Sequence, residues 1–523
     1  MRRDVTFKIE TYNSVTIDVE NDLGKENGAM QKLMRYCIAV FAVVGIVMTG
    51  CNRSAPKEMS VLIRMMPAQE RFFREQIIPV FEKQNKCKIN IVTFNSEWDI
   101  ERILKLENSK KDPSIALVKT PFEMARPLVK SGLMSDLYSV MDSNKVLMDM
   151  AEYHQLASGL AFFEGKPYYL PRKLETRIMF YRKSKVADAI AKFPAHKERI
   201  GKELKALNGY GIPNGYELEA DPQKWDFYDL YVVGSIWANE DYDGVKMGRI
   251  AHRGARYGGT ALDLVDKALQ LGASTNDVLK LTEDKVVDMF VWERNMIKSG
   301  CYNQGMWMDP WKGANIYNAI KDGKVYLTII QQIDAFLIHG WKDDPSMPTF
   351  LPEADDMGLA TMPTAVSFEL DSSGKPAYTG TKAISTGGWW WGIPKTSPDA
   401  KLAYALARFI TNKENQAKEC SRFGMIPVRK DILNNLPEVF DQGWVGEIFK
   451  TSVEQVQTNG LTTVPLVAEY ADVAQNYCDA WMTLCVEFKD KENDVMNFSG
   501  LKMRLASDYL DKQKKILGTD FPE

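Results

Sequence analysis

The residues of this sequence that point most clearly to a function are aromatic ones, whose ring faces can pack or stack. Trp389, Trp390 and Trp391 follow one another inside a segment that is spelled Gly-Gly-Trp-Trp-Trp-Gly-Ile-Pro, residues 387–394. Indole rings pack in a core or stack on a ligand, and flanking glycines indicate a strand whose backbone something approaches closely. Side chains alternate along a strand, so Trp390 should point opposite to its two neighbours. Either Trp390 or the other pair can then face a ligand, and packing in a core or hinge is an equal alternative for each.

Groups for covalent, metal or phosphate chemistry are scarce. The chain has 4 His and 7 Cys, and it lacks the His-Glu-x-x-His, Gly-x-Ser-x-Gly, Gly-x-Gly-x-x-Gly and Walker patterns. No Cys-x-x-Cys pair occurs, and a disulfide framework is not expected. We therefore expect no catalytic residues, no metal and no cofactor.

Composition limits the possible partners. The net charge is −3, without the basic excess that nucleic-acid binding requires, so we expect no nucleic-acid partner. Without its first fifty residues, the chain is still long enough for two or three domains with cores of their own.

The N-terminal region predicts export. A stretch with a basic character, 30–35, precedes the apolar run 36–48, which leads into Thr49-Gly50-Cys51. The run is shorter than the roughly 20 residues that span a bilayer, so it fits a secretory signal better than a transmembrane helix. Cys51 after Thr-Gly looks like a bacterial lipobox, with Met48 where that pattern prefers leucine. We expect Cys51 to be lipidated, and a plain buried or free cysteine is the alternative.

The elements that must position the aromatic residues alternate in type. Strands are predicted at 60–65, 88–94 and 114–118, and helices at 70–84, 101–109 and 122–131. This order indicates a parallel, doubly wound α/β sheet. After the tryptophan segment, Thr411 and Glu414 form a capping-box pattern for a helix that Gly424 can end.

Five segments together resemble the extracellular solute-binding proteins of sugar-type ABC importers, the maltose-binding-like family. Their order along the chain carries the resemblance, since each is a short pattern. They are the Gly-Leu-x-x-x-Leu phrase 132–137, the Gly-Lys-Pro-Tyr-Tyr-Leu-Pro turn 165–171 with its following strand to 183, the helix start 221–226, the strand 323–330, and the tryptophan strand with its two helices, 387–424.

The resemblance implies a periplasmic-binding-protein-like fold, with two α/β lobes joined by hinge strands and a ligand cleft between them. We expect residues 1–50 to form a leader and signal, with the natural start at Met30 or Met34, and residues 51–58 to form a tether. The lobes are expected at 59–173 plus 363–427 and at 174–362 plus 428–523.

Site residues are implied by the same resemblance. Glu175 stands four residues after Pro171, where the family places a ligand-facing glutamate, and Arg172 could serve instead. Thr120 and Phe122 follow the third strand, where family members contact ligand from the first lobe. The candidates from the second lobe are Trp307, Trp311, Gln331 and Asp334. Sugars need such a mixture, because aromatic faces cover their C–H side and planar polar groups bind their hydroxyls.

We therefore expect a monomeric, lipid-anchored extracytoplasmic receptor, in the periplasm or on the outer face of the cell membrane, that delivers a sugar or oligosaccharide to ABC permease subunits. One alternative is a secreted, lipid-anchored glycan hydrolase. It would need two carboxylates about 5–10 Å apart, and Glu175 with Asp309 or Asp334 could supply them. The other alternative is a surface glycan-capture protein without a permease.

Overall fold

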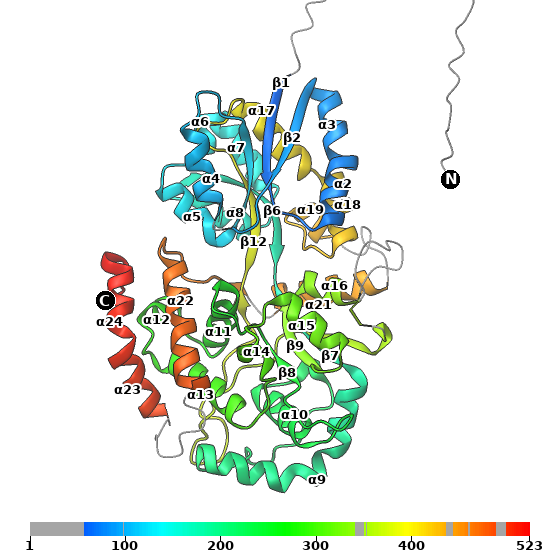
Figure 1. The fold of residues 1–523 in the computed structure, drawn as a ribbon, viewed down its shortest axis with the longest axis vertical. Helices are drawn as coiled ribbons and strands as arrows, with labels where there is room; N and C mark the ends of the chain where they lie inside the picture. The colour runs from blue at the N-terminus through cyan, green and yellow to red at the C-terminus, as the bar shows by residue number, and fades with distance from the viewer. Residues whose placement is uncertain are drawn as a thin grey trace, which may run out of the picture. The chain divides into compact units, whose positions relative to one another are not determined.

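The computed structural model describes residues 57–97, 99–339, 350–351, 353–435, 443–458, 461–487 and 498–523. These residues form two α/β lobes, each built on its own sheet (Figure 1). The signal segment and Cys51 lie outside the described residues. Lys57 and Glu58, which the sequence placed in the tether, already belong to the first strand. Among the described helices, none combines the length and apolar character that crossing a bilayer requires.

The first lobe contains a five-stranded sheet in the order β2-β1-β3-β12-β6. Its strands are β1 (Lys57–Ile63), β2 (Cys87–Thr93), β3 (Ile115–Pro121), β6 (Tyr169–Glu175) and β12 (Gly387–Gly392). β1 pairs in parallel with β2 and β3, as predicted, whereas β12 is antiparallel to both β3 and β6. The sheet is therefore mixed, because the chain returns from the second lobe to insert β12.

Helices connect and cover the strands of the first lobe. They are α2 (Pro67–Phe72), η1 (Phe73–Ile77), α3 (Ile78–Asn85), α4 (Asp99–Asn108), α5 (Phe122–Lys130), α6 (Leu137–Val140), α7 (Ser143–Ala151), α8 (Gln155–Gly159), α17 (Ala400–Ile410), α18 (Lys413–Phe423) and α19 (Lys430–Leu433). The predicted helix 70–84 is thus one helical run with a π segment in its middle. The N-cap of α18 is Asn412, whose side chain accepts from Asn415 N at 2.8 Å, rather than Thr411; Gly424 ends the helix with φ 60°. A two-stranded hairpin, β4 (Phe162–Phe163) and β5 (Lys166–Pro167), precedes β6.

The tryptophan strand β12 is packed on both faces of the first sheet. Trp391 stacks on Phe73 of η1, with ring centroids 6.1 Å apart, while Trp390 contacts Phe122 at 5.9 Å and donates to the Ala157 carbonyl at 3.1 Å. Trp389, at the end of β12 that points to the second lobe, stays partly exposed. The side chains alternate as expected, but the residues of one face do not share one environment. Trp390 and Trp391 both lie in the core, and Trp389 is the partly exposed one.

The glycines around these tryptophans permit close packing. A Cβ on Gly388 would lie 2.6 Å from the Lys173 carbonyl oxygen, and one on Gly392 would lie 2.3 Å from the Met134 methyl carbon. The close approach inferred from the sequence is therefore made by neighbouring parts of the same lobe.

The second lobe contains a four-stranded sheet in the order β10-β7-β9-β8. The strands are β7 (Arg177–Arg182), β8 (Ile250–Ala251), β9 (Leu327–Gln331) and β10 (Met357–Ala360). The helices are α9 (Lys183–Asn208), η2 (Pro222–Lys224), α10 (Phe227–Asn239), α11 (Gly258–Gln270), α12 (Thr275–Lys280), α13 (Asp284–Lys298), α14 (Gly305–Met308), α15 (Gly313–Lys321), α16 (Gln332–His339), η3 (Ala354–Asp356), α21 (Trp444–Thr458), α22 (Tyr470–Trp481), η4 (Met482–Glu487), α23 (Phe498–Asp508), α24 (Leu510–Leu517) and η5 (Gly518–Asp520). In Figure 1, α22, α23 and α24 line one side of this lobe.

The chain crosses between the sheets beside two threonines. Thr176 separates β6 from β7, and Thr386 separates the short strand β11 (Ile384–Ser385) from β12. β11 pairs in parallel with β13 (Leu461–Thr462). Figure 1 shows β6 and β12 side by side, running down from the first lobe toward the second.

Two hydrophobic cores match the two sheets. The core of the first lobe is formed mostly by residues between Met59 and Leu174 and between Trp390 and Ile432. The core of the second lobe is formed mostly by residues between Ile178 and Leu370, together with residues of the C-terminal helices. The sequence placed the boundaries at 363 and 427, but Ala365–Leu370 pack with the second sheet and Val428 with the first. The physical reason is that the chain enters the first core at Thr386 and stays in it through Ile432.

This packing predicts a stability split within the tryptophan strand. Trp390→Ala and Trp391→Ala should each lower the free energy of unfolding by about 3–5 kcal/mol, because each leaves a cavity in the core. Trp389→Ala should cost far less, since its side chain already touches solvent. Chemical denaturation followed by circular dichroism measures all three; an equal loss for Trp389→Ala would contradict the assignment.

Candidate functional site

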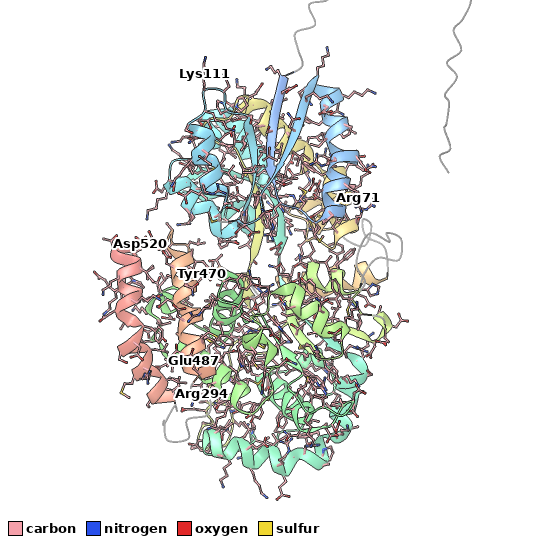
Figure 2. All side chains as sticks on the ribbon, in the orientation of Figure 1. Arg71, Lys111, Arg294, Tyr470, Glu487 and Asp520 are labelled. Atoms are coloured by element: carbon pink, nitrogen blue, oxygen red, sulfur yellow. The ribbon has the colours of Figure 1, made fainter. Side chains whose placement is uncertain are left out.

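A cleft of about 600 Å³ lies between the two lobes, next to the crossings. First-lobe walls come from the ends of β1, β3, β6 and β12, and second-lobe walls come from β9, α11, α15, α16 and α22. Tyr470, the first residue of α22 and labelled in Figure 2, is one wall residue. Carboxyl ends of parallel strands are where open α/β sheets bind ligands, and the volume suits a small molecule.

The first-lobe floor of the cleft combines an indole with charged groups. The Trp389 Nε1–H donates to Glu175 Oε1 at 3.1 Å, and Glu175 forms an ion pair with Lys173. The Lys119 ammonium lies 3.8 Å from the centroid of the Trp389 ring and donates to the Arg64 carbonyl. The register explains this grouping, because Lys173 lies directly opposite Trp389 on β6 and β12.

Glu175 remains ionised in this buried setting. Burial alone would raise the pKa of its carboxyl, but the charge and hydrogen bond of Lys173, followed by the charge of Lys119 and the hydrogen bond from Trp389, bring that pKa below its ordinary value. The carboxylate is therefore an acceptor that holds its neighbours in place.

One hydrogen bond spans the cleft. Gln331, the last residue of β9, donates from Nε2 to Glu175 Oε2 at 3.2 Å, so it joins the second lobe to the first. Asp334 on α16 accepts from the Tyr317 hydroxyl and pairs with Arg253 at 3.5 Å. Burial raises the pKa of the Asp334 carboxyl, although Arg253 partly offsets the effect. The second-lobe wall is thus polar and internally paired.

Five predicted site residues line the cleft, from both lobes: Phe122, Glu175, Gln331, Asp334 and Trp389. The others do not. Arg172 is fully buried, where it pairs with Glu419 and lies over Trp391. The register of β6 shifts at this point, because Trp389 lies opposite Lys173 and Trp390 lies opposite Pro171. Arg172 is the extra residue, and its guanidinium is directed to Glu419 and Met425 rather than into the cleft.

The remaining predicted residues pack elsewhere. Thr120 is buried in β3 opposite Trp390. Trp311 is buried in the second core, close to Gly305, and Trp307 packs against that core from a partly buried position. Asp309, a carboxylate considered for hydrolysis, is exposed and does not line the cleft.

Several cleft residues were missed from the sequence: Lys119, Lys173, Arg253, Tyr257 and Tyr317. A signal existed for Lys173, because it is two residues from Glu175 and two-residue spacing shares a strand face. Arg253 and Tyr257 lie in a basic, glycine-rich stretch before α11, which carried no periodic pattern.

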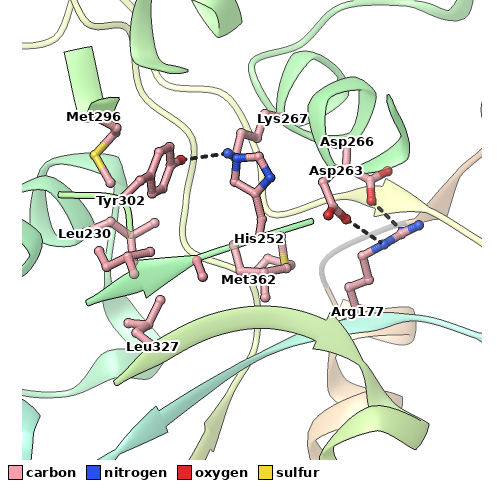
Figure 3. Close-up of a pocket in the computed structure, with 13 residues that line it drawn as sticks. Arg177, Leu230, His252, Asp263, Asp266, Lys267, Met296, Tyr302, Leu327 and Met362 are labelled. Carbon is pink, nitrogen blue, oxygen red and sulfur yellow. Dashed lines mark hydrogen bonds and ion pairs between the residues drawn. The ribbon is translucent and has the colours of Figure 1, made fainter. Parts of the chain in front are cut away.

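A second cavity, of about 30 Å³, is enclosed within the second lobe (Figure 3). Arg177 pairs there with Asp266 at 2.5 Å and with Asp263 at 3.7 Å, and Lys267 donates to the Tyr302 hydroxyl at 2.9 Å. His252 and Lys267 both pair with the buried Glu293. This volume is about that of one water molecule, so the cavity cannot hold a sugar. No cluster suited to a metal ion occurs among the described side chains.

The comparisons with known proteins agree with this geometry. The sequence model of a family described as bacterial extracellular solute-binding protein matches residues 76–444. No curated protein sequence matches the chain.

Among solved structures, the GacH receptor of Streptomyces glaucescens, determined unliganded and with acarbose, has a TM-score of 0.62 and 16% identity over 89% of this chain and 100% of its own. Maltose-bound MalE3 of T. maritima has a TM-score of 0.59 and 15% identity over 86% and 99%. An ABC substrate-binding protein of Listeria monocytogenes, in complex with cycloalternan, has a TM-score of 0.61 and 14% identity over 88% and 99%.

The solved structures share the two-lobed fold, and the family match covers most of the chain, including the tryptophan strand and both crossings. The chain therefore belongs to the bacterial extracellular solute-binding protein family, whose members are binding proteins and not enzymes.

Proposed function

We propose that the protein is a lipid-anchored extracytoplasmic receptor that binds a sugar or oligosaccharide in the interlobe cleft and delivers it to the permease of an ABC importer. The observation that carries the proposal is the cleft floor, where the Trp389 indole lies beside Glu175 and Gln331. An apolar ring face with adjacent planar acceptors and donors matches the two surfaces of a sugar.

The ligands of the structural neighbours support a sugar. Acarbose, maltose and cycloalternan are the molecules named for the three proteins compared above. The cleft volume of about 600 Å³ leaves room for a ligand of that class.

To signal to a permease, binding of a ligand in the cleft must change the position of one lobe relative to the other. The Gln331–Glu175 hydrogen bond connects them directly beside Thr176, where the chain crosses. A ligand that bonds to both walls would favour a closed arrangement in the same way, a hinge-type transition.

Hydrolysis and glycan capture without a permease fit less well. Glu175 is committed to Lys173, Trp389 and Gln331, and Asp334 to Tyr317 and Arg253. Burial raises the pKa of a further cleft carboxyl, Glu123, to about 7, and this group is not ion-paired in the described part of the chain. A retaining or inverting hydrolase needs two such carboxyls, and Glu123 lacks a free second one. The family match, to a family of solute-binding proteins, favours delivery over mere capture.

A binding experiment tests the proposal. Isothermal titration against a panel of mono- and oligosaccharides should identify a ligand that also raises the melting temperature, because it binds the folded form only. Trp389→Ala should lower the affinity for that ligand by roughly tenfold, because an aromatic ring that stacks on a ligand contributes on the order of 1 kcal/mol beyond the burial of its apolar area.

Tyr210→Ala is the matched control. Tyr210 is an exposed aromatic residue just after the end of α9, and it does not line the cleft. Its affinity should equal that of the unchanged protein. Absence of binding by every sugar, or normal affinity in Trp389→Ala, would overturn the placement of the site.

Anchoring has its own test, because Cys51 lies outside the described residues. Expressed in a bacterium that processes lipoproteins, the chain should yield a mature form that begins at a lipidated Cys51 and partitions into detergent. Cys51→Ala should leave the protein unprocessed or released. Cys37→Ala, within the apolar run, is the control and should remain anchored; a mature N-terminus elsewhere without lipid mass would refute the anchor.

A further inference from the structure

Lys119 is an unusual residue of the cleft floor. It lies near the end of β3, its residue is only 4% exposed, and yet it lines the cleft. Its ammonium group donates to the Arg64 carbonyl and lies over the Trp389 ring. In the described part of the chain, no carboxylate forms an ion pair with it, whereas Lys173 and Arg172 each have one.

The charges around Lys119 do not balance. Three cations lie close together here, Lys119 and Lys173 in the floor and Arg172 behind it, and the carboxylates beside them are Glu175 and Glu419, each already paired. Arg64, whose carbonyl binds Lys119, directs its own guanidinium to Glu97. Glu123 of α5 also lines the cleft and forms no ion pair in the described part of the chain, but it is not among the charges that act on Lys119. The positive charge left without an ion-pair partner is therefore the local one of Lys119.

A buried charge without a partner is costly. Burial lowers the pKa of the Lys119 ammonium well below its usual value, and repulsion from Arg172 and Lys173 lowers it further, against weaker opposition from Glu175 and Glu419. A negative group placed beside Lys119 would remove this cost. Such a group would gain more there than at the exposed surface, where salt and water screen the attraction.

The second-lobe wall offers no equivalent position. Arg253 is the cation of that wall, and it already pairs with Asp263 and Asp334, both at 3.5 Å. Any selection for negative charge must therefore come from the first-lobe floor.

We propose that the ligand of this cleft is an anionic sugar, whose carboxylate or sulfate pairs with Lys119 beside Trp389. This inference rests on the proposed function and narrows its ligand class. Glu175 and Gln331 then bind hydroxyl groups, and the anionic substituent lies on the side of Trp389 that Lys119 covers.

Matched pairs of ligands provide the test. Isothermal titration would compare oligogalacturonates, oligoglucuronates and oligomannuronates with their uncharged methyl esters, and sulfated carrageenan disaccharides, which carry no carboxylate, with their uncharged desulfated forms. We expect the tightest ligand to be acidic and its neutral partner to bind at least tenfold more weakly. The carboxylate and sulfate arms distinguish the two sources of charge.

Lys119→Met provides the second measurement, since it keeps the length of the side chain and removes the charge. In this variant the affinity for the acidic ligand should fall at least tenfold, while the affinity for its uncharged analogue should stay unchanged. Lys88→Met is the control, because Lys88 is an exposed lysine of the neighbouring strand β2 in the same lobe. Melting curves of both variants confirm folding, and the ligand pairs on the unchanged protein decide the question even if Lys119→Met is unstable.

The outcomes separate the two levels of proposal. Tight binding of a neutral sugar, with its acidic analogue equal or weaker, overturns the anionic ligand and leaves the sugar receptor intact. An acidic preference that persists in Lys119→Met also overturns it. Absence of binding by every sugar, charged or neutral, counts against the proposed function itself.

Discussion

Buried carboxylates fix the chain where it crosses between the lobes. On the second-lobe side, Asp266 contacts both crossings. It forms an ion pair with Arg177, the residue that follows Thr176, and it accepts a hydrogen bond at 2.8 Å from the backbone amide of Ser385, the residue that precedes Thr386. On the first-lobe side, Glu175 binds Lys173 and the Trp389 indole. The same contacts that hold the two crossings together thereby position the cleft floor, so the geometry of the site depends on the hinge.

The interior of the second lobe restricts where motion can occur. Glu293 is fully buried and binds His252, Lys267, Tyr302 and Trp481. Removal of one partner from such a network leaves a buried charge, which is strongly destabilising, so the network resists rearrangement. The crossings at Thr176 and Thr386 lie outside this network, and each lobe keeps its own core on either side of them.

Sequence patterns predicted the elements of the first lobe well, because hydrophobic alternation and glycine or cap signals are local. β12 was predicted at its observed place, and β1, β2 and β3 within about three residues. The site was predicted less well. Strand parity could not show where Arg172 points, because the register of β6 shifts at that residue. It could not show that Phe73 covers Trp391 while Trp389, on the same face, reaches the cleft, because that depends on where a helix from residues 73–77 ends over the sheet.

The residues that build the two cores are largely different from those that line the cleft. The neighbours share 14–16% identity with this chain, so the two-lobed architecture tolerates replacement of most side chains. The cleft is lined instead by a few polar and aromatic groups at the ends of β3, β6, β9 and β12. Here Lys119 covers one face of the Trp389 ring, which leaves at most the opposite face for stacking on a sugar. The ammonium in that position is buried and has no ion pair among the described residues, a feature that stability alone does not explain.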